Sequence, residues 1–155
     1  MSEKSVNLNQ CINQRMNNLS DPIEIIDLRH TLLSHRKDGI IVLQCNDNHT
    51  YSKEEIIENH ETIRKLSPHQ KAFVLTIAGR YTSIEPEAKK YTAAGRHESF
   101  IGAEAFVIHN LAQRILAQFY FKINKPIVAS EYFTDLNKAE KWILQQKINY
   151  EKNNL

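Results

Sequence analysis

The sequence has few of the residues on which common enzyme motifs depend. Its four glycines are scattered along 155 residues and cannot form a phosphate-binding loop or a dinucleotide-binding fingerprint. No Gly-x-Ser-x-Gly segment is present, so the nucleophile turn of the α/β-hydrolases is excluded. These absences favour a protein without catalytic activity, and we expect no cofactor.

Cysteine is also scarce. The two cysteines, Cys11 and Cys45, are too few for a disulfide framework. Because Cys45 ends an apolar run, we expect a small buried thiol in a reducing compartment. The sequence offers no evident base to activate it, so thiol catalysis has no support.

Long apolar runs and a large excess of one charge are absent as well. No run of about 18 apolar residues exists, so we expect no membrane span. The polar residues 1–22 lack the apolar stretch of a signal peptide. A formal net charge of +2 is too small to indicate nucleic-acid binding. We therefore expect a soluble cytoplasmic protein with no nucleic-acid partner.

The seven histidines form no metal-binding pattern. No two of them stand at i,i+4, and no His-Glu-x-x-His segment exists, so no metal is expected. The adjacent His97 and Glu98 could join a polar site only through the fold. An unrecognised enzyme that uses this pair is therefore the weakest hypothesis.

Strand and helix patterns alternate regularly along most of the chain. Residues 22–47 hold two strand-like runs around Lys37-Asp38-Gly39, and Asp-Gly between apolar runs predicts a β-hairpin. Ser52 and Glu55 predict a capping box at the start of a helix that Ser67-Pro68 ends. Further strands are predicted at 71–79, 102–109 and 127–134, with helices beginning near Pro86, at Asn110 and at Thr134 or Asp135.

The predicted order of elements is ββαβαβαβα. Strands that alternate with single helices predict crossover connections and a mostly parallel sheet, to which the N-terminal hairpin adds an antiparallel edge. We expect one α/β domain over residues 23–147, between a polar N-terminal extension (1–22) and a polar C-terminal tail (148–155).

Three segments together resemble a known family. They are IEPEAKKYTAAGRHE, FVIHNLAQRILAQFYFKINKP and YFTDLNKAEKWI. They are similar to small uncharacterised bacterial proteins of the STAS and CRAL-TRIO-like superfamily, which has the SpoIIAA-like fold of the anti-anti-sigma factors. The resemblance covers residues 23–147 and implies this fold, no cofactor and no agreed reaction.

The resemblance also implies a candidate regulatory site. Antagonist members of the family bind a partner kinase and are switched off by phosphorylation at the start of the helix after the third strand. Thr82 and Ser83 lie near that position, although the Asp-Ser-Ser-Gly type of motif is absent. A phosphate there would meet the free N–H groups of a helix N-terminus. The alternative is that the same hydroxyls only cap the helix.

The helix predicted over residues 110–123 has two different faces. Arg114, Gln118 and Phe121 form a mixed face, which we expect to point outward as an interface with a partner or a second copy. A lone exposed aromatic residue is the alternative. The opposite face, predicted to be buried, consists of Leu111, Ala112, Ile115, Leu116, Phe119 and Ile123.

Two functional hypotheses remain open. The first is a non-enzymatic regulatory module that binds an unknown regulatory protein, or a second copy as a homodimer. The second is a carrier or sensor of a small apolar or anionic, lipid-like ligand between sheet and helices, as the resemblance to CRAL-TRIO-like proteins implies. An apolar cavity of roughly a few hundred cubic ångströms would favour the ligand, and a filled core would favour the module.

Overall fold

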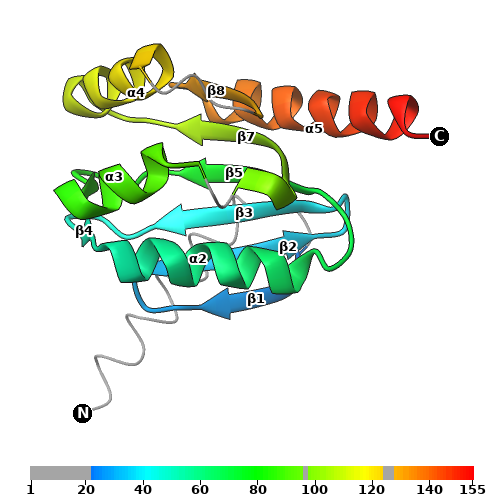
Figure 1. The fold of residues 1–155 in the computed structure, drawn as a ribbon, viewed down its shortest axis with the longest axis horizontal. Helices are drawn as coiled ribbons and strands as arrows, with labels where there is room; N and C mark the ends of the chain where they lie inside the picture. The colour runs from blue at the N-terminus through cyan, green and yellow to red at the C-terminus, as the bar shows by residue number, and fades with distance from the viewer. Residues whose placement is uncertain (1–21, 96–97, 124–127) are drawn as a thin grey trace.

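The computed structural model describes residues 22–95, 98–123 and 128–155, and a six-stranded mixed sheet forms its centre (Figure 1). The spatial order of the strands is β1-β2-β3-β5-β7-β8. Strands β1, β2 and β3 are antiparallel, and β3, β5, β7 and β8 are parallel. The strands are β1 (Pro22–Asp27), β2 (Thr31–Arg36), β3 (Ile40–Cys45), β5 (Ala72–Ile77), β7 (Ile101–Val107) and β8 (Ala129–Phe133). This arrangement confirms the predicted α/β class.

Helices α2 (Lys53–Leu66), α3 (Pro86–Ala93) and α4 (Leu111–Ile123) connect the parallel strands, and α5 (Leu136–Asn153) follows the last strand, β8. The short strands β4 (Thr50–Tyr51) and β6 (Ser83–Ile84) pair in parallel outside the main sheet, and a 3-10 turn, η1 (Glu98–Phe100), precedes β7. The capping box predicted at Ser52 and Glu55 is confirmed, as is Asp135 as the N-cap of α5.

The N-terminal part of the sheet differs from the prediction in one detail. The predicted hairpin joins β2 to β3, and Gly39 takes the positive φ of 85° that its turn needs. The run before the hairpin, however, forms two strands, because the chain turns back at Arg29 with a φ of 70°. The Asp27 carboxylate stabilises this turn by accepting a hydrogen bond from the Arg29 N–H at 2.7 Å.

Each face of the sheet has its own hydrophobic core. On one face, Val42 and Leu75 pack with Ala139 and Ile143 of α5. On the other face, Leu43 and Val74 pack with Ile63 of α2. Burial on both faces explains why the inner strands read as continuous apolar runs. Helix α5 extends past the sheet at its C-terminal end (Figure 1).

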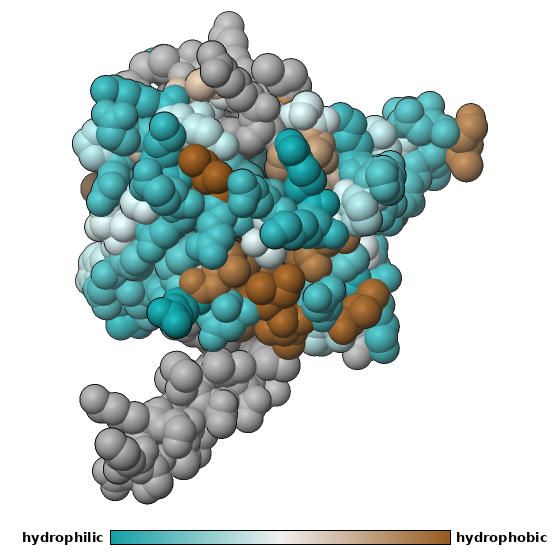
Figure 2. Space-filling view, turned by 60° about the horizontal axis from the view of Figure 1, so that its bottom comes forward, coloured by the Kyte–Doolittle hydropathy of each residue, from teal (hydrophilic) through white to brown (hydrophobic). Residues whose placement is uncertain are grey.

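The surface at the β1 edge of the sheet is mainly hydrophilic. Figure 2 turns this edge toward the viewer and shows hydrophobic side chains gathered in one area of its lower half. On β1 itself, Ile23 is 64% exposed. None of the helices in the described part of the chain combines the length and the apolar character that a membrane span requires.

Helix α4 is rotated relative to the prediction. Leu111 and Ile115, predicted to be buried, are 70% and 57% exposed. The buried position is instead Gln113, whose amide donates to the Gly79 carbonyl at 2.9 Å and accepts from the His109 N–H at 2.8 Å. These two hydrogen bonds remove the cost of burying the amide, so a polar residue can face the sheet. Apolar residues of α4 occur on most of its sides, so their spacing alone does not determine which side faces the sheet.

The polar C-terminal tail predicted from the sequence is mostly helical. Helix α5 continues to Asn153 and so includes most of the predicted tail over 148–155. Lys147 and Glu151 form an ion pair one turn apart, at 2.5 Å, and the Tyr150 ring lies edge-on to Phe73 at 5.6 Å. Such local pairs and one long-range contact are enough to continue a helix that lacks glycine and proline.

Candidate functional site

A cavity of about 440 Å³ lies between one face of the sheet and helices α2, α3 and α4. We call it the apolar cavity. Its walls are mostly apolar and include Val74 and Phe106 from the sheet, Ile56 from α2, and Leu116 and Phe121 from α4. Its volume lies in the range of pockets that bind small molecules, about 300–1,000 Å³.

Short side chains keep this space open. Ala93 of α3 and Ala117 of α4 face the cavity, and Thr76 and Ala78 line it from β5 and the loop that follows. Longer apolar side chains at these positions would fill part of the space.

Asn59 is the most unusual polar residue in the wall of the apolar cavity. It lies on α2 and is 5% exposed. Its Oδ1 is inaccessible to water and, within the described residues, its side-chain amide makes no hydrogen bond. The other buried polar residue of the same helix, Thr62, donates to the Glu58 carbonyl at 2.8 Å. A buried amide oxygen without a hydrogen-bond donor is rare in proteins and calls for a partner.

Cys45 and Tyr51 also line the apolar cavity, and both stay protonated at neutral pH. Burial raises the pKa of the Cys45 thiol to about 11, although a hydrogen bond with Tyr51 partly opposes this effect. Burial likewise raises the pKa of the Tyr51 hydroxyl. Neither group is therefore suited to act as a nucleophile. The expectation of a free, buried thiol at Cys45 is confirmed.

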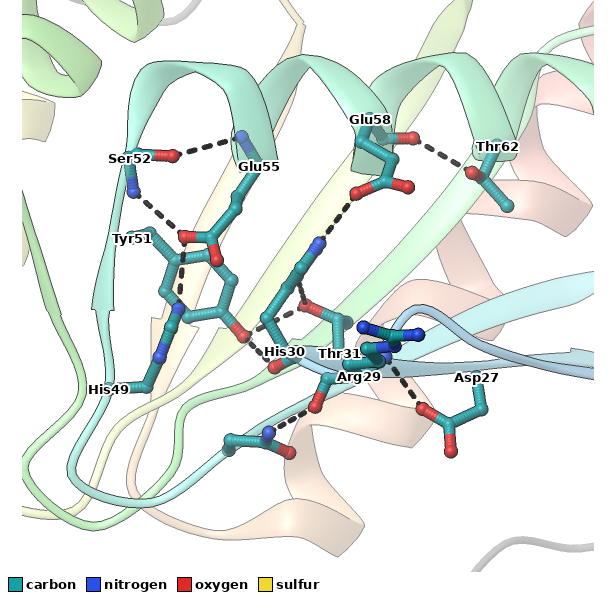
Figure 3. Close-up of polar contacts among 11 residues, drawn as sticks. Asp27, Arg29, His30, Thr31, His49, Tyr51, Ser52, Glu55, Glu58 and Thr62 are labelled. Atoms are coloured by element: carbon teal, nitrogen blue, oxygen red, sulfur yellow. Dashed lines mark hydrogen bonds and ion pairs between the residues drawn. The ribbon is translucent and has the colours of Figure 1, made fainter.

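Beside the apolar cavity lies a polar group that we call the His–Glu cluster: His30, His49, Glu55 and Glu58 (Figure 3). His30 Nε2 lies 2.8 Å from Glu58 Oε2, and His49 Nε2 lies 2.9 Å from Glu55 Oε2. The two imidazole rings are stacked at 6.2 Å, and both lie edge-on to the Tyr51 ring. Tyr51 thus separates this cluster from the apolar cavity.

Glu55 serves both the cluster and its own helix. Burial tends to raise the pKa of its carboxyl group, but hydrogen bonds from the Ser52 N–H and the His49 ring outweigh burial and lower this pKa overall. His30 and His49 lie in separate loops, and both glutamates lie on α2. No short sequence motif therefore indicated the cluster. The i,i+3 spacing of Glu55 and Glu58 was the only available signal.

Thr31, His30 and Glu58 are linked in the order of a hydroxyl–histidine–acid catalytic triad. Thr31 Oγ1 lies 2.9 Å from His30 Nδ1, and the other ring nitrogen of His30 faces Glu58. Thr31, however, is fully buried, and its hydroxyl is already shared with the Tyr51 hydroxyl at 2.8 Å. A substrate cannot reach this oxygen, so the arrangement is structural. Among the described residues, no group of three or more His, Cys, Asp or Glu is placed to hold a metal ion.

Comparison with known proteins identifies the family of this chain. A family model described as "Domain of unknown function (DUF7793)" matches residues 34–147. The chain belongs to this family. A comparison with curated proteins gives no match.

One solved structure is similar in fold to this DUF7793 protein. It is the crystal structure of an uncharacterized protein from the DUF3478 family, with a SpoIIAA-like fold, from Shewanella loihica PV-4. The TM-score is 0.54 and the sequence identity 9%, with 73% of this chain and 91% of that chain covered. At this identity the likeness shows the fold alone, and the SpoIIAA-like fold predicted from the resemblance is confirmed.

Thr82 and Ser83 border the apolar cavity of the DUF7793 protein but do not cap α3. The N-cap of α3 is Glu85, which makes no side-chain capping bond, and Pro86 follows it. The Thr82 hydroxyl instead donates to the Asn46 carbonyl at 2.9 Å, and the Ser83 hydroxyl lies 2.8 Å from that of Thr50. The capping alternative was wrong, because the loop pairs with residues 46–51 before the helix starts. Phosphorylation of either residue stays a prediction.

The predicted mixed face of α4 is divided. Arg114 and Gln118 are exposed, as expected. Phe121 instead lines the apolar cavity, with its ring 6.3 Å from Phe106 and 5.5 Å from Tyr132, so its outward orientation was wrong. The rotation of α4 about the buried Gln113 is the reason.

The candidate polar pair of His97 and Glu98 is not tested. His97 lies outside the described residues, and the same holds for the side chain of Glu98.

Proposed function

We propose that this DUF7793 protein is a non-enzymatic carrier or sensor of a small, mainly apolar molecule that binds in the apolar cavity. The cavity is the observation that carries this proposal. Its volume of about 440 Å³ is large enough for a small organic molecule. A preformed space of this kind costs little reorganisation on binding, which favours affinity.

The chemistry around the cavity supports binding over catalysis. Cys45 and Tyr51 are held in their protonated forms by burial. The His30 and His49 imidazoles are each engaged by a glutamate on the far side of Tyr51. An acid or base that acts on a ligand must lie within hydrogen-bond distance of it, and these groups are turned toward one another.

The test is to fill the cavity and measure the binding of a neutral fluorescent probe, N-phenyl-1-naphthylamine. Ala117→Leu adds three carbon atoms to the cavity wall from α4, and we expect probe affinity to fall at least tenfold. Ala112→Leu is the matched control, because Ala112 is exposed on the same helix. Absence of binding to the wild-type protein, or equal binding by both variants, would contradict the proposal.

A second candidate function is the regulatory, protein-binding role, and the outer face of α4 favours it. Leu111 and Ile115 are exposed one helical turn apart, and Arg114 and Gln118 lie beside them. Exposed apolar residues flanked by arginine are typical of protein interfaces. The partner in this proposal is a regulatory protein or a second copy of the chain.

A further inference from the structure

We propose that the ligand of the apolar cavity is uncharged and carries one hydroxyl or amide group, which binds the side-chain amide of Asn59. This inference rests on the proposed carrier function and adds the chemistry that the ligand must have. It follows from the hydrogen-bonding state of one residue, from the charges of the cavity wall and from the shape of the space.

The position of Asn59 in α2 is one that an apolar residue would normally occupy. Ile56 precedes it by one turn and Ile63 follows it by one turn, and all three side chains line the cavity. A leucine at position 59 would continue this apolar stripe. The asparagine instead places a polar amide there that is 95% buried (5% exposed) and makes no hydrogen bond within the described residues. Such a group destabilises the folded protein until a partner satisfies it.

The chemistry of an amide defines that partner. An asparagine side chain has one oxygen that accepts and one nitrogen that donates, and rotation about its last torsion exchanges the two. A hydroxyl group or an amide can donate to the oxygen and accept from the nitrogen. A pure hydrocarbon can do neither, so it would bind the apolar walls and leave Asn59 unsatisfied.

The charges around the cavity favour a neutral group over an anion. Glu104 of β7 already places an acidic group in the cavity wall, where a carboxylate or phosphate would be a second acid. Lys89 and Lys90 also line the cavity, but both are exposed on α3, and Lys90 pairs with Glu87 at 3.2 Å. Asn59 carries no charge, so an ion placed against it would lose its hydration without compensation.

The walls also favour a planar, aromatic body. Phe106 and Phe121 face the cavity with their rings edge to face at 6.3 Å. Aromatic rings pack well against such a pair, in offset or edge-on contact. The expected ligand class is therefore an aromatic or fused-ring molecule with one hydroxyl or amide substituent.

The experiment compares three probes that share one ring system and differ in the substituent: naphthalene, 2-naphthol and 2-naphthoate. Affinities for the full chain are measured by isothermal titration calorimetry. We expect the wild-type protein to bind 2-naphthol about tenfold more tightly than naphthalene, the factor that corresponds to one net hydrogen bond. We expect 2-naphthoate to bind most weakly of the three.

Asn59→Leu tests the role of the amide. We expect this variant to bind naphthalene at least as well as the wild type and to lose the tenfold preference for 2-naphthol. Without ligand it should melt at a higher temperature, because a buried unsatisfied amide is removed. Asn59→Ala gives the same comparison of probes if the leucine is too large for the site.

Ser34→Ala is the matched control. The Ser34 hydroxyl is also buried without a hydrogen-bond partner in the described part of the chain, but it lies on the opposite face of the sheet, paired with Val42 of the α5-side core. This variant should change the melting temperature and keep the preference for 2-naphthol. Loss of the preference here would show that it does not report on Asn59.

The failure of this inference can be told apart from failure of the carrier function. Equal affinity of the wild type for naphthalene and 2-naphthol, or a preference that survives in both Asn59 variants, overturns the role of Asn59 and leaves the carrier function standing. Tightest binding of 2-naphthoate overturns the neutral ligand in favour of an anion held at the lysines of α3. If none of the three probes and no N-phenyl-1-naphthylamine binds, the carrier function itself fails.

Discussion

The side-chain amide of Gln113 donates a hydrogen bond to the backbone carbonyl of Gly79, with 2.9 Å between nitrogen and oxygen. This bond joins the first turn of α4 to the loop after β5, and both segments border the apolar cavity. A Cβ at position 79 would lie 2.4 Å from the Asn46 carbonyl oxygen, so only glycine allows the loops to approach this closely. The orientation of α4, and with it the cavity, depends on this contact.

We expect Gln113→Ala to lower the free energy of unfolding by about 1–3 kcal/mol, because it removes the 2.9 Å hydrogen bond to the buried Gly79 carbonyl and leaves that carbonyl only the longer bond from the Thr82 N–H at 3.3 Å. Urea unfolding followed by the fluorescence of the single tryptophan, Trp142, measures the change. Gln118→Ala is the control on the same helix, and its exposed side chain should alter stability by less than about 0.5 kcal/mol. Equal effects of the two substitutions would disprove the anchoring role of Gln113.

Tyr51→Phe tests whether the Tyr51 hydroxyl contributes to stability or to ligand binding. The hydroxyl of this buried residue bonds Thr31 at 2.8 Å and the His30 carbonyl at 2.5 Å, so its loss should destabilise the protein by about 1–2 kcal/mol. The ring remains in place, so binding of N-phenyl-1-naphthylamine should not change. If the variant keeps its stability and loses probe binding, the Tyr51 hydroxyl contacts the ligand, and its assignment as a structural group is wrong.

The lowered pKa of Glu55 makes stability depend on pH. Because its carboxyl group is more acidic in the folded than in the unfolded protein, its contribution is present above the ordinary pKa of 4.5. It is lost as the pH falls through the lower, folded-state pKa. Glu55→Gln should therefore be less stable than the wild type at neutral pH, and the difference should shrink on acidification. Urea unfolding at a series of pH values measures this, with Glu61→Gln as an exposed control on α2.

The outer face of α4 gives a test of the interaction role. We expect the wild-type chain to self-associate through Leu111 and Ile115, and the double variant Leu111→Ser, Ile115→Ser to be monomeric at the same concentration. Both residues are exposed, so the variant should keep the wild-type melting temperature. Sedimentation velocity distinguishes the two states. A wild type that is monomeric throughout argues against a homodimer and leaves only a different protein as the partner.

Features that depend on near neighbours in the chain could be predicted from the sequence. The capping box of Ser52 and Glu55, the cap at Asp135 and the turn at Gly39 are all present as predicted. In each case the hydrogen bonds or dihedral angles involve residues within a few positions of one another. The turn at Arg29 is equally local but was missed, because it lacks glycine and is stabilised by the Asp27 side chain.

The candidate site depended on contacts that join distant segments. His30 and Glu58 are 28 residues apart, and Gln113 and Gly79 are 34 apart. The direction in which α4 faces was decided by the second of these contacts, against an apolar pattern that allowed more than one face. Asn59 could be proposed as a binding residue only when its burial and its lack of a hydrogen-bond partner among the described residues were known.

The sequence by itself therefore determined the order of most elements and the α/β class, because hydrophobic periodicity and caps act within a turn or a strand. The tertiary structure decided which side chains face each other across the sheet and the helices. It also decided whether the space between them is filled, since packing depends on the size of residues that are far apart in the chain. The apolar cavity and the His–Glu cluster are therefore features that only the tertiary structure decided, and the function proposed from the cavity depends on it as well.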